Sequence, residues 1–184
     1  MIAVVAATLL AACIDQRGPV VVASKIDTEG ALLSQMIVLM LRDSGIEVQD
    51  RSQFGPTQVV REALLNNEIS IYPEYTGNGA LFFDESDSEV WNDLNAGYER
   101  VKELDEREND VIWLRPAPAN NTWAIAVTET LAEQEGLKTL EDFAAYVDGG
   151  GKVKLAGSEE FVSGPVALPA FQRVYGFQLK NDQL

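Results

Sequence analysis

One short segment, Tyr72-Pro73-Glu74-Tyr75-Thr76-Gly77, concentrates aromatic, acidic and turn-forming residues. The face of a tyrosine ring attracts cations, and a cage of aromatic rings is a common way for a protein to hold a quaternary ammonium ion. Such an ion has no N–H group to donate, so ring faces and dispersion contacts must bind it. The alternative is that Tyr72 and Tyr75 are half-buried packing residues whose hydroxyls reach water. The residue types taken alone favour that alternative.

A second segment, Asn120-Asn121-Thr122-Trp123, pairs carboxamide donors with an indole ring. Amide side chains can donate to a carboxylate, and tryptophan is the strongest cation–π partner among the aromatic residues. The alternative is that the asparagines turn the chain while Trp123 packs in a core. Again the segment by itself favours the alternative.

Lys25 follows Ser24 at the end of a predicted strand and just before a predicted helix. An ammonium group beside a helix N-terminus could complement a carboxylate, although a solvent-exposed lysine is the commoner outcome. Trp91 and Trp113 are predicted to be core residues. The acidic runs 84–89 and 103–110 have no calcium-loop spacing and are predicted to be solvated faces.

The composition disfavours catalysis. The 184 residues include no histidine and one cysteine, Cys13, so the commonest general base and metal ligand is absent and no internal disulfide can form. No nucleotide-binding glycine motif and no nucleophile motif occurs. We therefore expect a protein that is not an enzyme and that needs no cofactor and no metal.

The charge balance also disfavours one class of binding partner. The chain has 14 lysines and arginines against 29 aspartates and glutamates, a formal net charge of −15. A polyanionic surface repels phosphate backbones, so nucleic acid is not an expected partner.

The N-terminus is typical of a targeting segment. Residues 2–12 are apolar except for Thr8, a run too short to span a bilayer but suited to a signal peptide. Leu10-Ala11-Ala12-Cys13 is similar to a bacterial lipobox, although no lysine or arginine precedes the apolar run. We interpret residues 1–12 as a signal peptide, Cys13 as the lipidation site and residues 13–19 as a tether. The alternative is a buried element with an incidental cysteine.

The next part of the chain alternates predicted strands and helices. The strands are expected at 20–23, 46–48, 69–72 and 111–114, and the helices at 29–44, 56–66 and 89–108. Asp27 or Thr28 is expected to cap the first helix, Gly45 to end it, and residues 54–57 to form a turn. This alternation predicts a mainly parallel sheet covered by helices, with ligands outside the carboxyl ends of its strands.

Residues 115–121, with two prolines and two asparagines, are interpreted as a crossover between lobes. Beyond them we expect strands at 122–127 and 152–156 and a helix from about 129. A capping box, Thr139 to Asp142, predicts another helix, and further helical segments are expected at 158–175. We therefore divide the chain into a first lobe, 20–115, and an incomplete second lobe, 116–184.

Several motifs in order carry a family resemblance. Residues 24–30 (SKIDTEG), 71–78 (IYPEYTGN), 116–124 (PAPANNTWA), 167–171 (ALPAF) and 175–177 (YGF) strongly resemble the osmoprotectant-binding proteins of bacterial ABC importers, in particular their YehZ-like, betaine-binding branch. The resemblance covers essentially residues 20–184.

This resemblance implies an α/β type II periplasmic-binding-protein fold of two lobes, with the C-terminal part missing after Leu184. It also implies the ligand-binding residues, which are Tyr75 and Trp123 in an aromatic cage, Lys25 and Asn78 lining the cleft, Asn121 near the crossover, and Tyr72, Thr76 and Asn120 as neighbours. The function expected is capture of glycine betaine or a related quaternary-ammonium solute, for an ABC permease and its ATPase, at the periplasmic or extracytoplasmic face of the membrane. Alternatives are another small solute, such as choline, carnitine or an amino acid, and a sensory binding lobe.

Overall fold

The computed structural model describes residues 18–184, which form two compact units that divide between Pro73 and Glu74. The predicted signal peptide, Cys13 and most of the predicted tether lie outside the described residues. The first unit contains, in order, β1 (Val20–Lys25), α1 (Thr28–Asp43), β2 (Val48–Gly55) and α2 (Thr57–Leu65).

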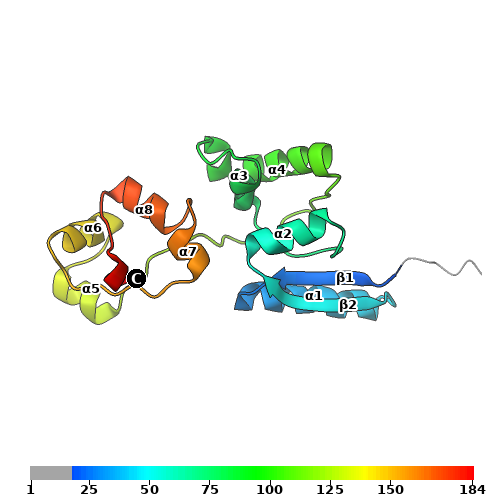
Figure 1. Ribbon diagram of the computed structural model, residues 1–184, viewed down its shortest axis with the longest axis horizontal. Coiled ribbons are helices and arrows are strands. Elements are labelled where there is room, and N and C mark those ends of the chain that lie inside the picture. Colours follow the sequence, from blue (N-terminus) through cyan, green and yellow to red (C-terminus); the bar gives the residue numbers. More distant parts are fainter. Residues whose placement is uncertain (1–17) are drawn as a thin grey trace, which may run out of the picture. The chain divides into compact units, whose positions relative to one another are not determined.

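β1 is the central strand of the first unit. It pairs in parallel with β2, and its other edge forms a parallel bridge between Val22 and Ile71. In this bridge the Ala23 N–H donates to the Ile71 carbonyl at 3.0 Å. Both helices contact the two strands, and α1 lies on one side of them while α2 lies on the other (Figure 1). The predicted parallel α/β arrangement is therefore present in residues 18–73.

Local signals placed the first helix correctly. Asp27 is its N-cap and accepts a hydrogen bond from the Gly30 N–H at 2.7 Å. Gly45 follows the helix with a φ of +76°, the left-handed conformation that glycine adopts without steric cost. The second strand was predicted less well, because β2 begins at Val48 and continues through Gly55, where a turn was expected. Pairing with β1 keeps these polar residues extended.

The second unit is mostly helical in its described part. It contains the 3-10 helices η1 (Thr76–Asn78), η2 (Glu89–Asn92) and η3 (Asn181–Gln183), and the α-helices α3 (Gly79–Phe82), α4 (Leu94–Asn109), α5 (Glu129–Glu135), α6 (Leu140–Asp148), α7 (Glu159–Ser163) and α8 (Leu168–Tyr175). The predicted capping box of α6 is confirmed, since Thr139 and Asp142 bond to each other's backbone N–H groups. No helix among residues 18–184 is both long and apolar enough to cross a membrane.

The long helix expected at 89–108 is divided in two. Ser88 caps only η2, and Asp93 then starts α4 by accepting hydrogen bonds from the Asn95 and Ala96 N–H groups. Both residues are good caps, and apolar periodicity alone could not indicate which of them starts the long helix.

Three predicted strands are wrong, because residues 111–114, 122–127 and 152–156 belong to no ladder in the described chain. Residues 69–72 reduce to the single bridge at Ile71. The apolar alternation still predicted burial, since Ile125, Val153 and Leu155 pack against a hydrophobic cluster. A strand needs a hydrogen-bonded neighbour as well as an apolar face, and the pattern reports only the face.

That cluster is the core of the C-terminal part of the second unit. Its buried members come from α6, α7, α8 and the loops beside them: Leu137, Phe143, Ala144, Val147, Phe161, Ala167, Leu168, Phe177 and Leu179. The first unit has its own smaller cluster of Ala23, Val60, Ala63 and Ile69, against which Tyr72 packs.

The acidic run 103–110 is only partly a solvated face. Asp105 is fully buried and accepts hydrogen bonds from Asn109 Nδ2 at 2.8 Å and Trp113 Nε1 at 2.5 Å. Trp91 and Trp113 are half-buried rather than fully enclosed, and Trp91 Nε1 donates to the Glu85 carbonyl at 2.9 Å. Both indoles donate hydrogen bonds and neither is fully buried, so their prediction as core residues is only partly confirmed.

Candidate functional site

The carboxyl end of β1 is where the connections of the first unit reverse direction. The chain passes from β1 to β2 on one edge and returns to Ile71 on the other, so residues 72 and 73 leave the sheet beside the end of β1. Lys25 is the last residue of β1 and is in register with Gly55 of β2. Ligands of open α/β sheets bind outside such a reversal point. The structure thus brings Lys25 and Tyr72 to the same end of the sheet.

Lys25 is only 5% exposed, so the alternative of a solvent-exposed lysine does not hold. Ser24 beside it is fully buried, and its hydroxyl donates to the Lys25 carbonyl and accepts from the Gln53 N–H, both at 2.8 Å. The N-terminus of α1 is capped by the carboxylate of Asp27. This helix terminus is therefore satisfied by the protein's own anion.

Residues 74–78 form a tight turn that carries three of the predicted ligand-binding residues. The Asn78 N–H donates to the Tyr75 carbonyl at 3.0 Å, which closes the 3-10 turn η1. Glu74 Oε1 accepts from the Tyr75 N–H at 2.7 Å and from Asn78 Nδ2 at 2.8 Å. Tyr75, Thr76 and Asn78 are each half-buried. A single carboxylate therefore holds both ends of this turn.

Asn120, Asn121 and Trp123 lie in an exposed segment that belongs to no helix or strand. The Trp123 side chain remains 46% exposed, and its ring packs against Phe161 of α7 with centroids 5.3 Å apart and planes tilted by 54°. Phe161 in turn contacts Phe171 of α8 at 6.2 Å. Residue patterns did not identify Phe161 as a support for Trp123, because only tertiary packing brings α7 beneath this segment.

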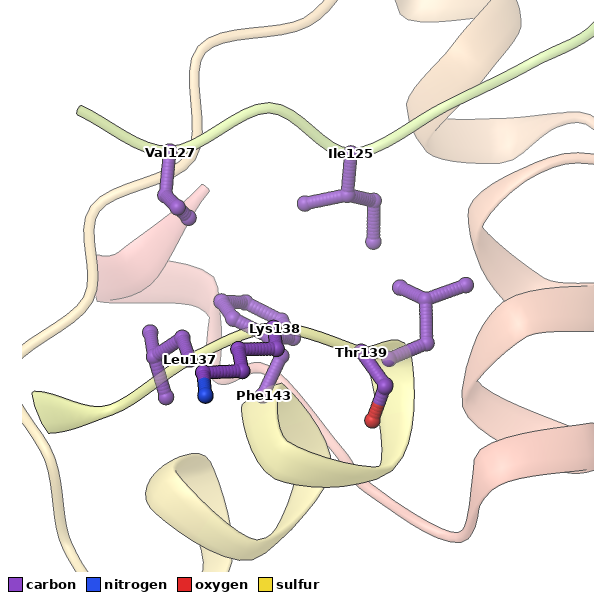
Figure 2. A pocket seen from close by; sticks show the side chains of 7 residues that line it. Ile125, Val127, Leu137, Lys138, Thr139 and Phe143 are labelled. Carbon is purple, nitrogen blue, oxygen red and sulfur yellow. The ribbon is translucent and has the colours of Figure 1, made fainter. Parts of the chain in front are cut away.

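A pocket of about 180 Å³ lies in the C-terminal part of the second unit. Figure 2 shows Ile125 and Val127 on one wall and side chains of the segment leading into α6 on the other. The complete lining is Ile125, Val127, Leu137, Lys138, Thr139, Leu140 and Phe143. None of the predicted ligand-binding residues lines it. It is an unfilled gap beneath a segment that belongs to no ladder.

The described residues offer no cluster of metal-binding groups. Within residues 18–184, no three aspartate, glutamate, histidine or cysteine side chains are grouped so that they could hold a metal ion. The lowered pKa of Glu85 comes from its hydrogen-bonded ion pair with Arg100 on α4, which is a structural contact.

Comparison with known proteins identifies the family. The model of the substrate-binding domain of ABC-type glycine betaine transport systems matches residues 18–183. The chain is 51% identical to the glycine betaine-binding protein YehZ of Escherichia coli K12 over 90% of its length, and 30% identical to a glycine-betaine-binding protein of Pseudomonas aeruginosa over 96%. It spans 54% and 58% of the lengths of these two relatives.

A solved structure supports the same assignment. The apo structure of YehZ from Escherichia coli matches 91% of this chain and 60% of its own length, with a TM-score of 0.59 and 50% identity. The match confirms the predicted α/β periplasmic-binding-protein fold. On these grounds, the chain belongs to the family of substrate-binding domains of ABC-type glycine betaine transport systems.

Proposed function

We propose that this protein is the solute-binding component of an ABC importer and that its solute is glycine betaine. The observation that carries the proposal is the turn 74–78. In this turn one carboxylate oxygen of Glu74 holds both the Tyr75 backbone and the Asn78 amide. Family membership and the names of the two relatives point to the same solute.

Glycine betaine carries a trimethylammonium group and a carboxylate, which need different partners. The ammonium group is assigned to the ring faces of Tyr75 and Trp123, because it can accept or donate no strong hydrogen bond. The carboxylate is assigned to the Lys25 ammonium and to the amides of Asn78 and Asn121. Tyr72, Thr76 and Asn120 are assigned to the surroundings of the site, and the packing of Tyr72 on the core of the first unit fits that lesser role.

The proposed mechanism is capture without chemical change. Solute would bind between a first lobe, 20–115, and a second lobe that starts at 116, and would stabilise their closed arrangement because that arrangement binds it better. The closed protein would dock on a membrane permease driven by an ATPase. Export by residues 1–12 and lipid attachment at Cys13 would place the protein in the periplasm or on the extracytoplasmic face of the membrane.

Two alternatives share this site. Carnitine carries the same two charged groups farther apart, choline and an amino acid each offer part of this chemistry, and a sensory lobe could use the same clamp without transport. Choline would need the aromatic rings but not the cationic and amide donors. An amino acid would need a carboxylate or carbonyl acceptor for its N–H groups. The relative affinities for these solutes therefore test the assignment of each partner.

Isothermal titration of the full-length protein with glycine betaine, choline and carnitine tests the proposal. We expect one-to-one binding, with glycine betaine tightest and the solute recovered unchanged. Trp123→Ala should weaken binding about fivefold or more, as a lost cation–π contact of about 1 kcal/mol implies. Ile112→Ala, at a residue 77% exposed, is the control and should bind like the parent. A folded protein that binds none of the three solutes would refute the proposed solute class.

A further inference from the structure

The Glu74 side chain folds back over the turn that follows it. Its Oε1 atom accepts the Tyr75 backbone N–H at 2.7 Å and the Asn78 side-chain N–H at 2.8 Å. One oxygen atom thus ties the first residue of the turn to the last. Glu74 is half-buried, which limits competition from water for these two bonds.

This contact sets the orientation of the Asn78 amide. A carboxylate accepts hydrogen bonds and donates none, so the amide must turn its NH2 group, and not its carbonyl, toward Glu74. One N–H is used in that bond. The second N–H remains a donor for a solute carboxylate, and the Oδ1 atom can contact polarised methyl C–H groups. Without this contact, the asparagine amide could turn either its NH2 group or its carbonyl oxygen toward the solute.

The opposite end of the turn is held by packing. A Cβ atom added to Gly79 would lie 2.5 Å from the Trp91 ring and 2.9 Å from the Val101 side chain, so these residues press directly on the backbone. Pro73 restricts the chain on the other side of the turn. The turn is therefore held in one shape before any solute arrives, which lowers the ordering cost of binding.

We propose that Glu74 is a positioning residue of the solute site. It holds the Tyr75 ring at its place and aims the Asn78 donor, without touching the solute itself. This inference rests on the proposed function, because the donor it aims is the one assigned to the solute carboxylate. Loss of Glu74 should accordingly harm binding of glycine betaine more than binding of choline, which has no carboxylate.

The test compares three variants of the full-length protein by titration with glycine betaine and choline. Glu74→Ala should weaken glycine betaine binding about tenfold, the upper end of the usual size for a lost hydrogen bond, and choline binding about threefold or less. Glu74→Gln keeps an oxygen that can accept both N–H groups, so its affinity should stay within about threefold of the parent. Adding Asn78→Ala to Glu74→Ala should cost less than the product of the two single effects.

Asp142→Ala is the matched control. Its Oδ2 atom also accepts two N–H groups, those of Lys138 at 2.9 Å and Thr139 at 3.0 Å, but it caps α6. This variant should lower the melting temperature and leave both affinities unchanged. If Glu74→Ala does not fold, Glu74→Asp, whose shorter side chain cannot reach both donors, replaces it with the same expectation.

The outcomes separate the two proposals. If the parent protein binds neither solute, the proposed function fails and this inference fails with it. If the parent binds, but Glu74→Ala has the same affinity as the parent and the same preference for glycine betaine over choline, the positioning role alone is refuted. The same conclusion follows if Glu74→Gln is as weak as Glu74→Ala, since Glu74 would then act through its charge, or if Asp142→Ala shows the same loss.

Discussion

Residues 18–73 and residues 125–184 are stabilised by different contacts. In the first segment, β1 exchanges backbone hydrogen bonds with β2 and Ile71, and buried polar side chains such as Ser24 complete the network. In the second segment the described residues form no ladder, and a cluster of aliphatic and aromatic side chains provides the core. The comparison teaches that a short apolar segment can end in a paired strand, as β1 does, or in a segment that packs on the core without pairing, as residues 152–156 do.

This contrast matters for the site. Lys25 and Tyr72 sit at the end of a sheet, so backbone pairing fixes where their side chains start. The backbone at Trp123 belongs to no helix or strand, so the position of its side chain depends on the contact with the Phe161 ring. Variants that remove one kind of contact should therefore affect the two segments differently.

The largest effect is expected from Phe143→Ala in the C-terminal cluster. Phe143 is 5% exposed and meets Phe177 edge-to-face at 5.4 Å. Removing its ring should lower the free energy of unfolding by about 3–5 kcal/mol, measured by urea denaturation followed by circular dichroism. Val174→Ala, at a residue 70% exposed on α8, is the control and should be nearly neutral. Equal, small effects would mean that side-chain packing is not what holds this segment.

Ser24→Ala tests the polar network of the first segment. The variant removes the hydroxyl of a fully buried residue, which accepts from the Gln53 N–H, and a lost hydrogen bond of this kind costs about 0.5–1.5 kcal/mol of unfolding free energy. Ser163→Ala is the control, because the Ser163 hydroxyl donates to the Glu159 carbonyl at an exposed position on α7. Urea denaturation gives the free energy of unfolding of both variants. A decrease for Ser163→Ala as large as that for Ser24→Ala would show that burial of the hydroxyl is not what matters.

The smallest effect is expected at the capping box of α6, and it should depend on pH. The Lys138 and Thr139 N–H groups hold the pKa of Asp142 below its ordinary value. A carboxyl whose pKa is lowered by folding stabilises the protein above the ordinary aspartate range and loses that contribution as the pH falls. The melting-temperature difference between the parent and Asp142→Asn should be full near neutral pH and shrink below about pH 4. A melting-temperature difference that does not change with pH would show that ionisation of the Asp142 carboxyl does not contribute to stability.

Helix termini were the features most predictable from residue order. Asp27 and the Thr139–Asp142 pair cap the helices expected of them, and Gly45 takes the left-handed conformation after α1. Each of these signals acts within about one helical turn, so no distant residue can overrule it easily. The exception is Ser88, where Asp93 caps the longer helix a few residues later.

The candidate site was partly predictable. The motif 72–78 indicated a turn whose residue types could bind a ligand. The structure adds that the Glu74 carboxylate accepts hydrogen bonds from both Tyr75 and Asn78. Residue order left open whether Lys25 is exposed, and the structure buries it, while Asp105 was expected to be solvated and is enclosed by Trp113 and Asn109. Burial of a charged group depends on which partners surround it, and those partners come from other parts of the chain.

Residue types and spacing by themselves determined most of the longer helices, several of their caps and the apolar faces, because these depend on neighbours within a few residues. The family resemblance also lies in short stretches of sequence such as 71–78. Only the tertiary structure decided which apolar segments pair as strands, that Phe161 supports Trp123, and that Lys25 is buried at the end of β1. Strand pairing and burial are contacts between residues far apart in the chain, and their free energy exists only once the chain has brought both partners together.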